Sequence, residues 1–208
     1  MGEGEEFRVR QAQRVNYGEK GLQRSISDVL NTVFDHYQYT SLAEFNALLG
    51  LYRVRADRGR ENSRLYQTRG LIYHALDENG KAIGSYIKAS SFLLRPTLAR
   101  LEEKFALNAS LVLDNQRRVK TAIDWTLAGT PPDWDGFREA LGREGIDVVV
   151  QVGKTGDAKD IFFVDHEVKA VFRGVGLGEG YVLEAIRLRC ALERRQEEEL
   201  ERVQRLRL

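Results

Sequence analysis

The chain has little cysteine and little histidine, the residue types that build disulfides and many metal sites. Its 208 residues include one cysteine, so an internal disulfide is excluded and a cysteine metal cluster has no basis. Val182, Ile186 and Cys190 follow one another at helical spacing. This pattern predicts a helix on which Cys190 is a small buried apolar side chain rather than a reactive thiol.

The three histidines, His36, His74 and His166, stand alone in the sequence, without a second histidine or a cysteine at metal-site spacing. His74 and His166 also lie at different offsets from Asp77 and Asp165, which argues against a shared catalytic role. The sequence contains no cluster of acid, base, nucleophile or metal ligands. We therefore expect no metal, no cofactor and no enzymatic activity of this chain.

The chain also lacks an excess of one charge and a long apolar run. Lys and Arg total 32 against 31 Asp and Glu, so a contact with nucleic acid has to come from local basic patches. No run approaches the ~20 apolar residues of a membrane span. The acidic segment 1–6 lacks the order of a signal peptide. We expect a cytoplasmic protein with no membrane contact.

Two segments, Ser41–Gly50 and Asp133–Gly142, follow the same pattern. Each begins with a helix-capping residue, places apolar residues at the first, fourth, seventh and eighth positions after it, and ends with glycine. Such spacing predicts a short helix with one buried stripe. The chain therefore contains an internal repeat.

The repeat continues downstream, where 73–83 resembles 161–171. Both segments indicate two strands joined by a tight turn that opens with aspartate and ends in Lys-Ala followed by Ile or Val. The Asn-Gly pair at 79–80 is a strong hairpin signal. We predict an α+β fold of two tandem α-β-β-β-α units with antiparallel sheets, joined by a helix and a Gly-Thr-Pro-Pro linker at 129–132.

The expected organisation has three parts. Residues 1–24 form a basic extended segment, 25–128 form the first α+β unit with a connecting helix, and 129–208 form the second α+β unit with a long polar C-terminal helix. The expected helices are 25–37, 41–49, one from 95 or 96, 108–128, 133–141 and one from 181. The expected strands are 51–56, 70–76 and 81–88 in the first unit, and 146–152, 160–165 and 168–173 in the second.

Alternating glycines at 174, 176, 178 and 180 lead into the last helix. Their spacing matches neither the dinucleotide-binding fingerprint nor the P-loop. We interpret them as a bend or bulge that closes the sheet, and a phosphate contact at the helix start stays open as the alternative.

The segment 53–69 holds six arginines against two acidic residues, together with a tyrosine. Arginine suits phosphate contacts and tyrosine suits base stacking, so the segment predicts DNA binding. A charged loop that serves solubility alone is the alternative. The candidate DNA-binding residues, with those of the hairpin and the N-terminal segment, are Arg53, Arg55, Arg58, Arg60, Arg64, Tyr66, Arg69, Lys81, Lys88, Arg8, Arg10 and Arg14.

Several strings within residues 15–105 resemble the region downstream of the nuclease in relaxase/mobilization nuclease proteins of conjugative and mobilizable elements. The second unit resembles it less closely. The strings are Tyr17–Glu19, Ser25–Ser27, Tyr39–Ala47, Ala56–Gly59, Gly70–Tyr73, Ile87–Phe92 and Arg95–Leu98.

Relaxases of this family nick one strand at a transfer origin through a tyrosine that becomes joined to the 5′ phosphate, assisted by a metal on a histidine cluster. No residue here matches that apparatus. The resemblance therefore implies a non-nuclease region of a relaxase in conjugative transfer, which binds or positions transfer-origin DNA, single- or double-stranded. The alternative is a protein-interaction or dimerisation module that docks relaxosome or coupling proteins, or a second copy; the near-zero net charge favours it.

Overall fold

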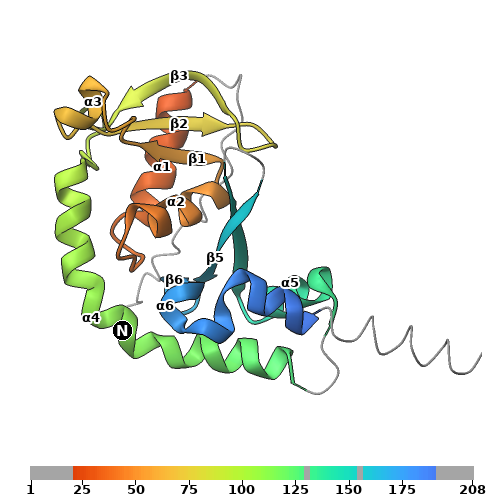
Figure 1. Cartoon of the computed structure of the whole chain (residues 1–208). Helices are drawn as coiled ribbons and strands as arrows, with labels where there is room; N and C mark the ends of the chain where they lie inside the picture. Colours follow the sequence, from red (N-terminus) through yellow and green to blue (C-terminus); the bar gives the residue numbers. More distant parts are fainter. Residues whose placement is uncertain (1–20, 129–131, 154–156, 191–208) are drawn as a thin grey trace, which may run out of the picture. The chain divides into compact units, whose positions relative to one another are not determined.

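The computed structural model describes residues 21–128, 132–153 and 157–190 (Figure 1). The described residues divide into two compact units, one of 21–37 and 41–106, the other of 38–40 and 107–190. The division falls within a helix, α4 (Leu98–Thr126), which covers both helices expected between residues 95 and 128.

The first unit is a three-stranded antiparallel sheet with helices on one face. The strand order is β1-β2-β3, and α2 and α1 contact β1 and β2 respectively (Figure 1). The elements are α1 (Leu22–Val33), α2 (Leu42–Leu51), β1 (Val54–Asp57), α3 (Arg64–Gln67), β2 (Ile72–Leu76), β3 (Ala82–Lys88), η1 (Ala89–Ser91) and the start of α4.

Buried and half-exposed residues alternate along the strands, which shows which face of this sheet is buried. Val54 and Ala56 of β1 and Tyr73 and Ala75 of β2 are buried, whereas the residues between them are half-exposed. The Tyr73 hydroxyl donates a hydrogen bond to the Pro96 carbonyl at 2.7 Å. One face of the first sheet is therefore the core face, and the other is left partly exposed.

The second unit repeats the order, and its central strand β5 is buried on both faces. The strand order is β4-β5-β6, and Ile161, Phe162, Phe163 and Val164, which alternate between the faces of β5, are all buried. The elements after α4 are α5 (Trp134–Arg143), β4 (Ile146–Val152), β5 (Ala158–Asp165), β6 (Ala170–Arg173), α6 (Gly174–Leu177), η2 (Glu179–Tyr181) and helical residues 183–190.

The predicted repeat of an α+β unit with an antiparallel sheet is confirmed. Ser41 caps α2 by accepting from the Glu44 amide at 3.2 Å, and Asp133 caps α5 by accepting from the Gly136 amide at 2.8 Å. Each hydrogen bond satisfies a backbone donor that the helix itself leaves unpaired. Because these signals are local in sequence, the two helices start where the pattern predicts.

Both predicted turns are organised by their aspartate. Asp77 Oδ1 accepts from the amides of Asn79 and Lys81 at 2.9 and 2.8 Å. Asp165 Oδ1 accepts from the amides of Glu167 and Val168 at 3.0 and 3.3 Å. These side-chain bonds to the following backbone are the reason that aspartate opens each turn.

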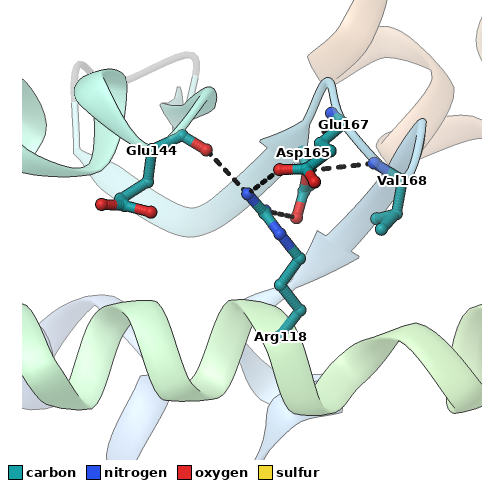
Figure 2. A network of polar contacts seen from close by, with 5 residues as sticks. All are labelled: Arg118, Glu144, Asp165, Glu167 and Val168. Carbon is teal, nitrogen blue, oxygen red and sulfur yellow. Dashed lines mark hydrogen bonds and ion pairs between the residues drawn. The ribbon is translucent and has the colours of Figure 1, made fainter.

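Asp165 is completely buried and is neutralised by an arginine of α4. Figure 2 shows Arg118 reaching from α4 to the Asp165 carboxylate, and also to Glu167 at 2.6 Å and to the Glu144 carbonyl at 2.9 Å. A buried carboxylate is tolerated when it is both paired and hydrogen-bonded. This network ties α4 to the second sheet, and we assign it a structural role.

Besides the single helix α4, the structure differs from the sequence expectations at two places. Residues 22–24 belong to α1, where Leu22 is in helical register with Ile26 and Val29, rather than to an extended segment. The segment between the strands expected at 51–56 and 70–76 contains the single-turn α3, capped by Ser63. The remainder of the N-terminal segment, the centre of the 129–132 linker and the C-terminal helix beyond residue 190 lie outside the described residues.

The glycine-rich segment bends, as expected, through α6 and η2. A Cβ on Gly174 would lie 2.4 Å from the Tyr181 carbonyl oxygen and 2.5 Å from Ile161 Cγ2, so close packing requires glycine there.

Cys190 is buried, as its helical spacing predicts. Among the described residues, no helix combines the length and the apolar run that crossing a membrane requires.

Candidate nucleic-acid interface

The exposed face of the first sheet carries an aromatic pair flanked by cations. The register places Arg55 opposite His74, so their side chains share one face. Tyr86 of β3 meets His74 edge-on at 6.2 Å between ring centroids. Tyr86 is 54 % exposed, whereas Arg55 and His74 are half-buried. The face therefore presents a tyrosine ring to solvent beside a positively charged side chain.

A groove lined by apolar and basic side chains lies at the end of this sheet where β3 leads into η1, with Leu65, Leu71 and Ile72 among its apolar residues. Tyr86 forms part of its wall, so the aromatic pair and the groove are continuous. The polar residues that line the groove are Arg64, Thr68, Arg69, Tyr86, Lys88, Ser90 and Thr97. Arg69 forms an exposed ion pair with Glu102. Lys88 lies opposite Ile72, at the last position of β3. Three cations and several hydroxyl groups are a donor set suited to phosphate.

The loop before α3 is held by its own side chains. The Arg58 guanidinium lies over the Tyr66 ring at 3.9 Å from the centroid, and Asp57 Oδ1 accepts from the Gly59 amide at 2.7 Å. Arg58 therefore covers one face of Tyr66, the tyrosine that the sequence predicts to stack on a DNA base. Arg60 is exposed on the same loop, and its carbonyl accepts from Ser63.

The remaining hairpin cations lie at the other end of the sheet. Arg53 precedes β1 and pairs with Glu78 at 3.3 Å, and Lys81 is exposed in the β2–β3 turn. The antiparallel register puts these residues beside Val54 and Ala82, whereas the groove lies beside the opposite strand ends. The structure thus brings Arg64, Arg69 and Lys88 together and separates them from Arg53 and Lys81.

Arg8, Arg10 and Arg14 lie outside the described residues. Tyr86 was not nominated from the sequence, although a tyrosine on the polar side of an alternating strand is a usable signal for an exposed sheet face.

The environment of His74 favours its neutral form. Burial lowers the pKa of His74, and the Arg55 charge lowers it further, whereas Asp57 acts in the opposite direction. His74 Nδ1 is buried and has no hydrogen-bond partner among the described residues, as is also true of Arg58 Nε. A neutral imidazole edge beside Tyr86 keeps this part of the face aromatic rather than charged.

No three His, Cys, Asp or Glu side chains gather into a set that could hold a metal ion in the described ranges 21–128, 132–153 and 157–190.

Comparisons with known proteins return no match. No model of a protein family matches the chain, no curated protein matches its sequence, and no solved structure matches its fold.

Proposed function

We propose that the chain is a DNA-binding, non-nuclease region of a relaxase that acts in conjugative transfer, and that the exposed face of the first sheet holds the DNA. The observation that carries the proposal is the exposed Tyr86 ring at the wall of a groove that contains Arg64, Arg69 and Lys88. The strings that resemble the relaxase family, in residues 15–105, support the link to transfer.

The groove and the Tyr86 ring can bind different parts of a nucleotide. The groove supplies cations and hydroxyl groups for backbone phosphates, and Tyr86 supplies a ring face for a base. The Tyr86 ring stands on the exposed face of the sheet, so a base can stack on the ring only when that base is not paired within a duplex. The arrangement therefore favours a single strand over a duplex, and the duplex would be held through phosphates alone.

A fluorescence-anisotropy titration tests the proposal. Labelled oligonucleotides, single-stranded and double-stranded, are titrated with the full chain at 50 and 200 mM salt. We expect binding that weakens steeply with salt, because each phosphate contact releases a counterion, and a lower dissociation constant for the single strand. Absence of binding to both forms at 50 mM salt would refute the proposal.

A further inference from the structure

The second unit has an open sheet edge of unusual composition. β4 is the first strand in the order β4-β5-β6, and among the described residues it pairs with β5 along one of its two edges. The strand Ile146–Val152 has the sequence Ile-Asp-Val-Val-Val-Gln-Val. It lacks the lysine and proline with which natural proteins protect an edge strand. An apolar edge of this length is a template for pairing with another strand.

The backbone groups that point away from β5 can be assigned. Gly145 accepts from the His166 amide at 2.9 Å, and the Gly153 amide donates to Asp157 at 2.7 Å. Since antiparallel pairing alternates along a strand, the odd-numbered residues of β4 turn their N–H and C=O groups toward β5. The even-numbered residues, among them Val148 and Val150, therefore direct theirs to the outer edge.

A bulge near the end of β4 does not interrupt this edge. Gln151 pairs with Asp160 and Val152 pairs with Ala158, so the extra residue, Lys159, belongs to β5. The alternation along β4 itself runs unbroken from Gly145 to Gly153.

The order of side-chain types in β4 is the same in both directions around Val149. Ile146 corresponds to Val152, Asp147 to Gln151, and Val148 to Val150. We propose that two copies of this chain join β4 to β4 in antiparallel fashion, with the twofold axis at Val149, so that their second sheets become continuous. A twofold interface places each residue opposite its counterpart, and here every counterpart is compatible.

The side chains also select this register. Val148 lies opposite Val150 of the partner subunit. Both are even-numbered residues, whose N–H and C=O groups point away from β5 and can therefore form hydrogen bonds across the interface. Asp147 lies opposite the partner's Gln151, an amide that can donate to a carboxylate, and it keeps its contact with His166 at 2.8 Å. A shift by two residues in either direction would place Asp147 opposite Val149 or Gly153 of the partner subunit, and the polar match would be lost.

Sedimentation velocity of the full chain over a range of concentrations is the first test. We expect a reversible monomer–dimer equilibrium. Gln151→Asp places two carboxylates opposite one another and should raise the dimer dissociation constant about tenfold, whereas Gln151→Lys should lower it. Thr121→Asp, at an exposed position of α4, adds the same charge as the control and should leave the constant unchanged.

Oxidative cross-linking tests the register. At the twofold axis, residue 149 of each copy lies opposite itself in a non-hydrogen-bonded pair, which is within disulfide reach. Val149→Cys should give a covalent dimer under mild oxidation, and Asp147→Cys, which faces the partner's Gln151, should not. A chain that is monomeric at every concentration, or a dimer indifferent to the residue at 151 and not cross-linked at 149, would overturn the proposal.

Discussion

The ring of Tyr86 stands edge-on to the ring of His74, with 6.2 Å between centroids and 63° between their planes. Edge-on packing fixes the tyrosine through its neighbour and leaves the ring more than half exposed. An aromatic ring held in this way loses little freedom when a planar ligand stacks on it. The pair is the centre of the DNA-binding surface that we propose.

Removing cations from the groove should change the salt dependence of DNA binding. Arg64→Ala and Lys88→Ala should each lower the slope of log affinity against log salt by about 0.7 for a single strand, because each removes one phosphate contact. Anisotropy titrations at four salt concentrations measure the slope. Arg143→Ala, which removes an exposed arginine paired with Glu139 in the second unit, is the matched control and should leave the slope unchanged.

Acid should destabilise the first unit through His74. Its pKa is lowered in the folded chain by burial and by Arg55, so the unfolded chain binds more protons below about pH 6.5. Stability therefore rises with pH through this window and is lost as the pH falls. Between pH 7.5 and 5, the thermal midpoint should fall further for the natural chain than for His74→Gln. Equal shifts in the two proteins would contradict this prediction.

Truncating Arg118 should be costly because it leaves a buried carboxylate unpaired. Asp165 has no exposed surface, and the guanidinium is its ion-pair partner. We expect Arg118→Ala to lower the free energy of unfolding by about 3 kcal/mol, measured by urea denaturation. Arg117→Ala, at the exposed neighbouring position, should change it by less than about 0.5 kcal/mol.

A double variant separates the ion pair from the packing of the arginine stem. Asp165→Asn removes the charge that Arg118 neutralises, so adding Arg118→Ala to it should cost much less than Arg118→Ala alone. If the two substitutions are simply additive, the carboxylate is not the reason for the loss.

A side chain at position 174 should lower the stability of the second unit. The Cβ of Gly174→Ala would meet the Tyr181 carbonyl oxygen and Ile161, so the substitution should cost about 1–3 kcal/mol. Gly176→Ala, two residues away, meets no atom within 4 Å and serves as the control. Similar urea midpoints for the two variants would argue against the close approach.

The parts of the fold that the sequence predicts are those with local causes. Ser41, Asp133 and the turn at 77–80 act on backbone groups a few residues away, so helix starts and hairpins follow from short patterns. The division of the units could not be predicted in this way. Gln38 forms a parallel bridge with Ala170, a pairing between distant residues that joins 38–40 to the second unit.

The candidate site was predictable in composition and not in arrangement. The arginines of 53–69 are evident in the sequence, but the antiparallel register places Arg53 and the groove at opposite ends of the sheet. Tyr66 was favoured for stacking, and the structure covers one of its faces with Arg58. Tyr86 stands on the polar side of its alternating strand, which is a usable sequence signal, but its place at the wall of the groove depends on tertiary structure.

Tyr86 provides the most direct test of the account. Anisotropy with a labelled single-stranded oligonucleotide at fixed salt compares the natural chain, Tyr86→Phe and Tyr86→Ala. We expect Tyr86→Phe to bind as the natural chain does, whereas Tyr86→Ala should lose about 1–3 kcal/mol, or about 5- to 150-fold in affinity, with an unchanged thermal midpoint. Equal affinity of all three proteins for the single strand would contradict it.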